Sequence, residues 1–329
     1  MKTAEIKKLA IIVPCYNEEC ILQDSASTLL ALLAKMTQKQ LVTEDSYLLL
    51  VNDGSTDSTW DIIQSLSTAD KHVHGVSLAA NAGHQNALMA GYATTYADKS
   101  VDMMVCIDAD LQDDEQCISD MVKNYYSGHD VVYGVRASRN TDTLWKRTTA
   151  KGFYKLMQRL GVKTVYNSAD FRLLSRRAVG QLLRYNERNL YLRGIIPMLG
   201  YDSATVKYDR RPRTAGETHY GLTRMVSLAF DGVTSFSLSL IHAVLYMGLI
   251  FLLISLGILA WVLWSWYSDN AVPGWSSLMV SVWFCTGCLL IALGIVGEYV
   301  GKVYREVKNR PRYNIEEYVG MDEELRIKN

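Results

Sequence analysis

The chain has no net charge, no internal repeat and no low-complexity segment. Its 34 lysines and arginines are balanced by 34 aspartates and glutamates. Residues 1–8 are polar, and the apolar run that follows has only the length of a strand, so we expect no signal peptide. These absences leave the class of the protein to be argued from local patterns of charge, hydropathy and acidic motifs.

Cysteine and histidine do not form the patterns of a disulfide framework or a zinc site. The six cysteines suit a reducing cytoplasm. Cys285 and Cys288 have the C-x-x-C spacing, but they lie in a predicted membrane helix without a second ligand pair, so we interpret them as packing residues. None of the six histidines has paired zinc-ligand spacing.

The zero net charge conceals two oppositely charged parts of the chain. Residues 1–135 contain 8 basic and 19 acidic side chains, whereas residues 136–224 contain 19 basic and 6 acidic ones. A basic segment of this size suggests an anionic partner. Nucleic acid is one candidate, but the chain has no recognition motif for it. Lipid phosphate and an anionic membrane surface fit better.

Two long stretches without charged residues predict that the chain enters a membrane. No Asp, Glu, Lys or Arg occurs between Asp231 and Asp269, or between Asp269 and Glu298. Each gap exceeds the roughly 20 residues that a spanning helix needs. We therefore predict transmembrane helices over 241–267 and 278–296. Two buried helices of a soluble domain are the alternative, which this length disfavours.

The charges around these two segments predict their orientation. The link 268–274 is short enough to make a helical hairpin, and it contains no lysine or arginine. Arg224 precedes the hairpin, and five basic residues follow it: Lys302, Arg305, Lys308, Arg310 and Arg312. The positive-inside rule therefore puts both flanks, and both termini, in the cytoplasm. Four aromatic residues would form the interfacial belt on the far side: Trp264, Trp266, Tyr267 and Trp275.

Three apolar runs each end in an acidic turn, within 9–18, 47–57 and 105–113. Continuous apolar runs predict strands that are buried on both faces, as in a parallel sheet. Helical stretches follow each run, for example over 58–66. Because ligands bind at the carboxyl ends of such strands, we expect the three acidic strand ends to converge on one cleft.

Asp108 and Asp110 are the most informative pair in these turns. Side chains at i and i+2 of an extended segment point the same way, so the two carboxylates could hold one hard divalent cation. The alternative is a pair of solvated loop acids, which is the commoner outcome for an isolated Asp-x-Asp. Here the two other acidic strand ends favour a site.

Together the motifs resemble the family-2 glycosyltransferases, which have the GT-A fold. The matching pieces are 14–18 (Pro-Cys-Tyr-Asn-Glu), 52–57 (Asn-Asp-Gly-Ser-Thr-Asp) and 108–113 (Asp-Ala-Asp-Leu-Gln-Asp). Segments 169–176 and 213–220 extend the resemblance to the branch that glycosylates polyprenyl phosphates, which includes dolichol-phosphate mannose synthases and bactoprenol glucosyltransferases. The resemblance covers nearly the whole chain.

The resemblance implies an α/β, Rossmann-like GT-A domain with a mostly parallel central sheet, followed by the transmembrane hairpin. It implies an inverting, metal-dependent transfer of sugar from a nucleotide donor to polyprenyl (undecaprenyl) phosphate at the cytoplasmic face of the inner membrane. UDP-glucose is the first donor to test, while GDP-mannose and modified UDP-sugars remain open. We expect a homo-oligomer, and no nucleic-acid partner.

The resemblance also implies roles for individual residues. Asp108, Asp110 and Asp170 would be catalytic, with Mg²⁺ or Mn²⁺ held by Asp110 and Gln112. Asp53 would bind the nucleobase, although 52–55 also makes a good turn, and both can hold. The other expected donor-binding residues are Pro14, Tyr16, Glu18, Asn81, Asp108 and Arg213.

The acceptor site is predicted from charge. A lipid phosphate is already nucleophilic, so it needs positioning cations more than a strong general base. Arg136 and Arg139 follow the predicted strand 130–134, and Arg147 lies on the next helix, so we nominate these three for the acceptor phosphate. The alternative is a basic face that meets anionic lipid headgroups. His219 stands where the family generally has lysine, which makes that charge titratable.

We divide the chain into a catalytic domain (1–215), a juxtamembrane amphipathic helix (216–236), two transmembrane helices (237–300) and a cytoplasmic tail (301–329). The juxtamembrane helix has an apolar stripe within 222–233, and this stripe either lies on the membrane or packs on the core of the catalytic domain. The sequence leaves two alternative functions to compare. A processive polysaccharide synthase usually has Gln-x-x-Arg-Trp, whereas residues 181–185 end in tyrosine. A scaffold or lipid carrier does not need converging acids.

Overall fold

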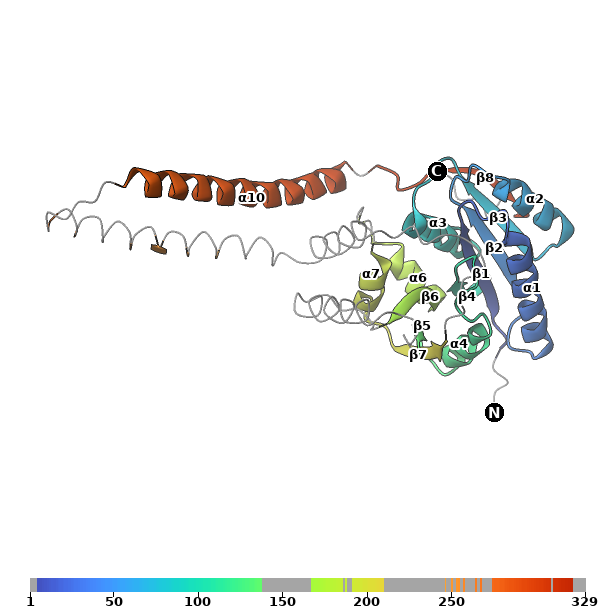
Figure 1. Ribbon diagram of the computed structural model, residues 1–329. Helices are drawn as coiled ribbons and strands as arrows, with labels where there is room; N and C mark the ends of the chain where they lie inside the picture. The colour runs from blue at the N-terminus through green and yellow to red at the C-terminus, as the bar shows by residue number, and fades with distance from the viewer. Residues whose placement is uncertain are drawn as a thin grey trace. The chain divides into compact units, whose positions relative to one another are not determined.

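The computed structural model divides into two compact units (Figure 1). One comprises Met1–Lys155, Lys163–His219 and Arg310–Asn329, and the other comprises Leu156–Val162 and Tyr220–Asn309. The structure describes residues 5–137, 167–185, 187, 191–209, 246, 250, 253, 254, 257, 264, 267, 274–308 and 310–321.

The first unit is an α/β domain with an eight-stranded sheet in its described part, in the order β7-β5-β6-β4-β1-β2-β3-β8. The strands are β1 (Lys8–Cys15), β2 (Tyr47–Asn52), β3 (Val73–Leu78), β4 (Val101–Cys106), β5 (Val131–Arg136), β6 (Ser168–Ser175), β7 (Ser203–Tyr208) and β8 (Ile315–Val319). β3, β2, β1 and β4 pair in parallel, as do β5 and β7, whereas β6 and β8 are antiparallel to their neighbours. The predicted α/β fold with a mostly parallel sheet is confirmed.

Helices cover both faces of this sheet. They are α1 (Leu22–Gln38), α2 (Thr59–Ala69), α3 (His84–Ala97), α4 (Cys117–Tyr126), α6 (Arg176–Leu182) and α7 (Leu192–Met198). On one face, Leu9 and Ile11 of β1 share a buried cluster with Leu29 of α1. On the other face, Gly91 of α3 lies against Ile12, where a Cβ would come within 2.4 Å of the Ile12 side chain. Strands buried on both faces explain the continuous apolar runs in the sequence.

The reversed direction of β6 brings the start of this strand to the edge where β4 and β5 end. Cys106, the last residue of β4, lies opposite Arg172 in β6, and Val135 near the end of β5 lies opposite Ser168. Asp170 therefore lies at the same edge of the sheet as the acidic turn after β4. An antiparallel strand thus supplies a fourth acidic group to the edge that the parallel strands form.

The segment expected to be only a cytoplasmic tail contributes an edge strand to the first unit. β8 pairs with β3, and Asn314 just before it accepts a hydrogen bond from the Ala79 amide at 2.9 Å. Trp60 Nε1 donates a hydrogen bond to Glu317 Oε2 at 3.0 Å. Val319 of the strand packs against the core, whereas the adjacent acids Glu316 and Glu317 are exposed. Residues 315–319 of the predicted tail thus form a strand of the first unit, and the division of the chain into domains stays a prediction.

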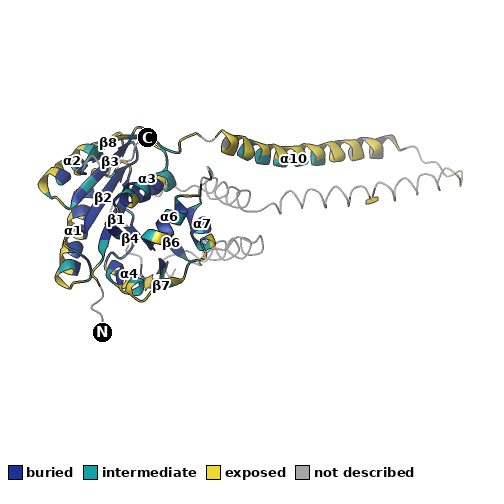
Figure 2. Cartoon of the chain, turned by 180° about the vertical axis from the view of Figure 1, so that it is seen from behind, coloured by how far each residue is buried: buried dark blue, intermediate teal, exposed yellow. Residues whose placement is uncertain are grey.

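The second unit contains one long apolar helix in its described part, α10 (Trp275–Val307). Its window Phe284–Tyr304 is long and apolar enough to cross a membrane, and none of that window is buried (Figure 2). The segment predicted at 278–296 is therefore helical, although the apolar window lies several residues later. Most of 241–267 lies outside the described residues, and its seven described residues are helical. The two-helix hairpin stays a prediction.

Candidate functional site

The turns after β1 and β2 are joined by hydrogen bonds at the carboxyl edge of the sheet. Asn17, with a left-handed φ of 56°, accepts a hydrogen bond from the Thr56 amide through Oδ1 at 2.9 Å. The Asn17 amide donates to Ser55 Oγ at 3.0 Å, and the Glu18 amide donates to Thr59 Oγ1 at 2.9 Å. The predicted convergence of these two acidic strand ends is therefore present as a network of backbone and side-chain contacts.

Asp53 links the end of β2 to the turn after β3. Asp53 is only 3% exposed, and its carboxylate accepts hydrogen bonds from the backbone amides of Ala82 at 2.7 Å and Gly83 at 3.0 Å. Burial raises the pKa of Asp53, and the two amides oppose the rise. Asp53 thus holds the turn after β3, whereas the turn at 52–55 is bonded by Asn52 Oδ1, which accepts the Ser55 backbone amide. A contact between Asp53 and a nucleobase stays a prediction.

The other predicted donor-binding residues lie around the same edge with different exposures. Pro14 is buried in β1 opposite Val51 of β2. Tyr16 is 46% exposed, Glu18 is half-buried, and Asn81 is exposed in the turn that Asp53 holds. An exposed aromatic ring at this edge can stack on a base, and the polar side chains there can hydrogen-bond to a ribose. Arg213 lies outside the described residues.

The turn after β4 gathers carboxylates. The side chain of Asp108 is about 45% exposed, and its pKa is raised by desolvation and by the charges of Asp170, Asp113 and Asp110, which His84 opposes. Asp110 is half-buried, and its Oδ1 accepts a hydrogen bond from the backbone N–H of Gln112 at 3.3 Å. The mutual repulsion among these acids is what a bound cation would relieve.

Asp110 and Gln112 fit a hard divalent cation in their ligand type. Both supply side-chain oxygen, and Mg²⁺ in enzymes is often held by one or two carboxylates together with substrate phosphates. Within the described part of the chain, no three His, Cys, Asp or Glu side chains are arranged as a complete metal site.

Asp170 lies at the start of β6 between two arginines. Arg193 approaches it with Nη2 2.8 Å from Oδ2 and Nε 3.3 Å from Oδ1, and Arg172 Nη2 contacts Oδ1. His84 Nε2 lies 3.8 Å from Asp170 Oδ2 and 3.7 Å from Asp108 Oδ1. Burial would raise the pKa of Asp170, but the charges of Arg193 and Arg172 hold it well below its ordinary range. Asp170 is therefore ionised at neutral pH.

A buried chain of hydrogen bonds holds the backbone carbonyl of Asp170. Tyr92 Oη donates to Cys106 Sγ at 2.9 Å, and Cys106 Sγ donates to the carbonyl oxygen of Asp170 at 2.6 Å. Arg172, which is 1% exposed, donates through Nε to the same carbonyl at 3.2 Å. Such packing fixes the backbone of Asp170 relative to the end of β4.

Of the three arginines nominated for the acceptor phosphate, the structure describes Arg136. It ends β5, its side chain is 27% exposed, and its Nη2 lies 3.7 Å from Oδ1 of the buried Asp113. Arg136 is therefore at the expected edge and is already placed beside an acid. Arg139, Arg147 and the titratable His219 lie outside the described residues, so their roles stay predictions.

Three residues at this edge were not predicted: His84, Arg172 and Arg193. Arg193 is the single charge in the apolar helix α7, whereas Arg172 shares the buried strand β6 with Asp170. A lone charge in an apolar element is a usable signal, because burying it without a partner is costly. His84 begins α3 directly after the turn held by Asp53, and its sequence carried no comparable signal.

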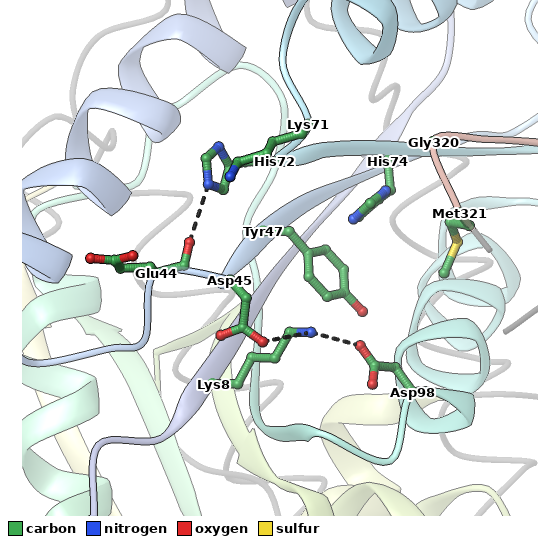
Figure 3. A pocket seen from close by; sticks show the side chains of 10 residues that line it. All are labelled: Lys8, Glu44, Asp45, Tyr47, Lys71, His72, His74, Asp98, Gly320 and Met321. Carbon is green, nitrogen blue, oxygen red and sulfur yellow. Dashed lines mark hydrogen bonds and ion pairs between the residues drawn. The ribbon is translucent and has the colours of Figure 1, made fainter.

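A separate pocket of about 370 Å³ lies at the opposite edge, where the strands begin (Figure 3). Lys8 Nζ lies between Asp45 Oδ2 at 3.2 Å and Asp98 Oδ2 at 3.0 Å, beneath the ring of Tyr47. None of the predicted site residues lines this pocket. The candidate site is therefore the carboxyl edge of the sheet, where the acids meet.

The sequence pattern of the family described as "Glycosyl transferase family 2" matches residues 10–183, which include the acidic turns and Asp170. The chain belongs to glycosyl transferase family 2. It is therefore a glycosyltransferase, and the resemblance on which the predicted site rested is confirmed.

This glycosyltransferase is similar to several known proteins, of which two relatives and one solved structure are described here. It is 47% identical over 310 residues to the uncharacterized glycosyltransferase YkoT of Bacillus subtilis, covering 94% of this chain and 91% of YkoT. It is 36% identical to the SfII prophage-derived bactoprenol glucosyl transferase of Shigella flexneri, covering 94% and 97%. A mannosyltransferase structure from Pyrobaculum calidifontis is 12% identical with a TM-score of 0.43, covering 94% and 89%, and is too distant to inform the site.

Proposed function

We propose that this glycosyltransferase transfers one sugar from a nucleotide donor to a polyprenyl phosphate at the cytoplasmic face of a membrane. The observation that carries the proposal is the joint presence, at one edge of the sheet, of a carboxylate turn at 108–113 and of the partly exposed Arg193 beside Asp170. The first suits a cation-bound diphosphate and the second suits an anionic acceptor. The bactoprenol glucosyl transferases among its relatives support this acceptor class.

On the donor side, Asp110 and Gln112 would hold Mg²⁺ or Mn²⁺. When bound, the cation would neutralise the diphosphate leaving group. Asp108 would contact the sugar or ribose, and Arg213 the phosphates. Pro14, Tyr16, Glu18, Asn81 and the turn anchored by Asp53 would enclose the base and ribose. UDP-glucose is the donor we propose first, because the bactoprenol relatives are glucosyl transferases.

On the acceptor side, a phosphate oxygen of the lipid would attack the anomeric carbon from the face opposite the leaving group. The new carbon–oxygen bond forms as the bond to the nucleoside diphosphate breaks, so the anomeric configuration inverts. The attacking phosphate is already ionised, so no proton has to be removed. Arg136, Arg139 and Arg147 would position it by charge-assisted hydrogen bonds.

The membrane location rests on the apolar helix α10 and on the uncharged stretch before it. The unburied window Phe284–Tyr304 supports one spanning helix, and the composition of 241–267 supports a second. A hairpin with cytoplasmic basic flanks would keep the catalytic domain on the side where nucleotide sugars are made and would bring it to its lipid acceptor.

The proposal is tested by following labelled sugar. Full-length protein in detergent is incubated with undecaprenyl phosphate and, in turn, labelled UDP-glucose, GDP-mannose and a modified UDP-sugar. We expect label in the organic extract as a single glycosyl lipid with one of the donors. Label in a long polymer would indicate a processive synthase instead, and label in neither fraction would contradict transfer to a lipid.

A further inference from the structure

The contact between Arg193 and Asp170 uses one side of the Arg193 guanidinium. Nε and Nη2 face the two carboxylate oxygens, at 3.3 and 2.8 Å. This is the two-pronged geometry that arginine adopts with carboxylate or phosphate. It fixes the plane of the guanidinium group as well as its position, which a single hydrogen bond would not do.

Asp170 is poorly suited to act as a general base. Both of its carboxylate oxygens are already occupied by guanidinium donors, Oδ1 by Arg172 and Arg193, and Oδ2 by Arg193. A carboxylate that accepts several charge-assisted hydrogen bonds gains little from taking a proton. The acceptor proposed above is an ionised phosphate, which needs no base. The position of Asp170 is thus better explained by its contact with the arginines than by a role as a general base.

The two arginines differ in their access to solvent. The side chain of Arg172 is 1% exposed, whereas that of Arg193 is 36% exposed. Arg193 is therefore the arginine of the two whose guanidinium group a ligand can reach. Arg172 balances Asp170 from beneath, so the cluster keeps a buried partner for Asp170 when Arg193 is replaced.

We propose that Arg193 is a further acceptor-binding residue that contacts the lipid phosphate, and that Asp170 is the positioning residue that orients its guanidinium group. This inference rests on the proposed function. The diphosphate of the donor is assigned to the cation site at Asp110 and to Arg213, so the remaining anionic group of the reaction is the acceptor phosphate. A phosphate monoester carries up to two charges and matches the arginine fork.

The test is made on full-length protein in detergent without a sugar donor. Binding of farnesyl phosphate is measured by calorimetry for the wild type and for Arg193→Gln, Arg193→Lys and Arg177→Gln, with farnesol as the ligand that lacks phosphate. Arg177 is the matched control because it pairs with Asp130 just beyond the other end of β6. We expect Arg193→Gln to weaken farnesyl phosphate binding by about 10- to 100-fold, as for loss of a charged hydrogen bond.

The control variants show whether a loss of binding comes from a lost contact with the ligand or from a disturbed fold. Arg193→Lys should recover part of the binding, because it restores the charge but not the fork, and Arg177→Gln should bind as the wild type does. In turnover, Arg193→Gln should raise the acceptor KM while the donor KM changes less than about twofold. An equal rise in the donor KM, or unchanged farnesyl phosphate binding, would overturn the assignment.

The inference and the proposed function can fail separately. If the wild type binds farnesyl phosphate through Arg193 but transfers no sugar to polyprenyl phosphate, the proposed function fails and the assignment of Arg193 stands. If sugar is transferred but Arg193→Gln binds and reacts as the wild type does, the assignment of Arg193 fails. A thermal melt of each variant confirms that the compared proteins are folded.

Discussion

Gly54 lies so close to Asn81 that a Cβ at position 54 would be 2.5 Å from the Asn81 backbone nitrogen. The turn after β2 and the turn after β3 are thus in direct backbone contact, next to the carboxylate of Asp53. Gly54 also has a left-handed φ of 64°, which disfavours other residues. Both features make this glycine necessary to the geometry of the predicted donor-binding edge.

Replacing Gly54 by alanine should therefore lower the free energy of unfolding by more than the backbone strain at a left-handed φ accounts for, because the new Cβ would also overlap the turn after β3. Gly200 is the matched control, because its φ is 73° but a Cβ there would meet nothing within 4 Å. We expect Gly200→Ala to lower the free energy of unfolding by about 1–2 kcal/mol through backbone strain, and Gly54→Ala by about 1–3 kcal/mol more through overlap. Denaturant unfolding measures both. Equal losses would contradict the close contact.

The pKa of Asp170 makes a prediction about acid stability. Because its folded pKa is lowered by Arg193 and Arg172, its contribution is complete above the ordinary carboxyl pKa and is lost as the pH falls toward the folded value. The difference in unfolding free energy between the wild type and Asp170→Asn should be constant from about pH 5 to 9 and shrink below about pH 4. A difference that does not change down to pH 3 would contradict this ionisation state.

The parts of the site predicted from the sequence were those formed by neighbouring residues. Apolar runs of strand length that end in acids identified the turns at 14–18, 52–57 and 108–113, because parallel strands bring their carboxyl ends to one edge. The contact of Asp170 with Arg193 was not predictable in this way. It depends on the reversed direction of β6 and on the position of the short helix α7, which only tertiary packing determines.

β8 was missed for a related reason. Its five residues, Ile-Glu-Glu-Tyr-Val, contain two adjacent acids, so the apolar alternation that identifies a strand is interrupted. Its partner β3 lies more than 200 residues earlier in the chain, and no local pattern reports such a pairing. The strand forms because β3 offers an unpaired edge and because Trp60 provides a donor for Glu317.

The hydrogen bonds of Glu317 can be tested separately from its charge, because Glu316 beside it carries the same charge. Both Glu316 and Glu317 are exposed in β8, but Glu317 accepts hydrogen bonds from Trp60 at 3.0 Å and Gln64 at 3.3 Å. We expect Glu317→Ala to lower the free energy of unfolding by about 0.5–1.5 kcal/mol and Glu316→Ala by less than about 0.5 kcal/mol. Denaturant unfolding with tryptophan fluorescence reports both. A larger loss for Glu316→Ala would contradict the described edge strand.

The proposed topology predicts where reporters are accessible. Basic residues flank the proposed hairpin on both sides, and the link 268–274 has none. Reporters at the N-terminus and the C-terminus should be cytoplasmic, whereas one at Asn270 should lie across the membrane. A C-terminus on the far side would leave an odd number of spans and would contradict the hairpin.

The most direct test of the account is the mass of the lipid product. Wild-type protein, undecaprenyl phosphate, UDP-glucose and Mg²⁺ should yield the lipid phosphate increased by one hexose. Asp110→Asn and a chelator should each abolish this product while the melting temperature of Asp110→Asn stays close to that of the wild type, because a neutral amide is a poor Mg²⁺ ligand. No glycosyl lipid with any donor, or full conversion by Asp110→Asn in the presence of chelator, would contradict a metal-dependent transfer to polyprenyl phosphate.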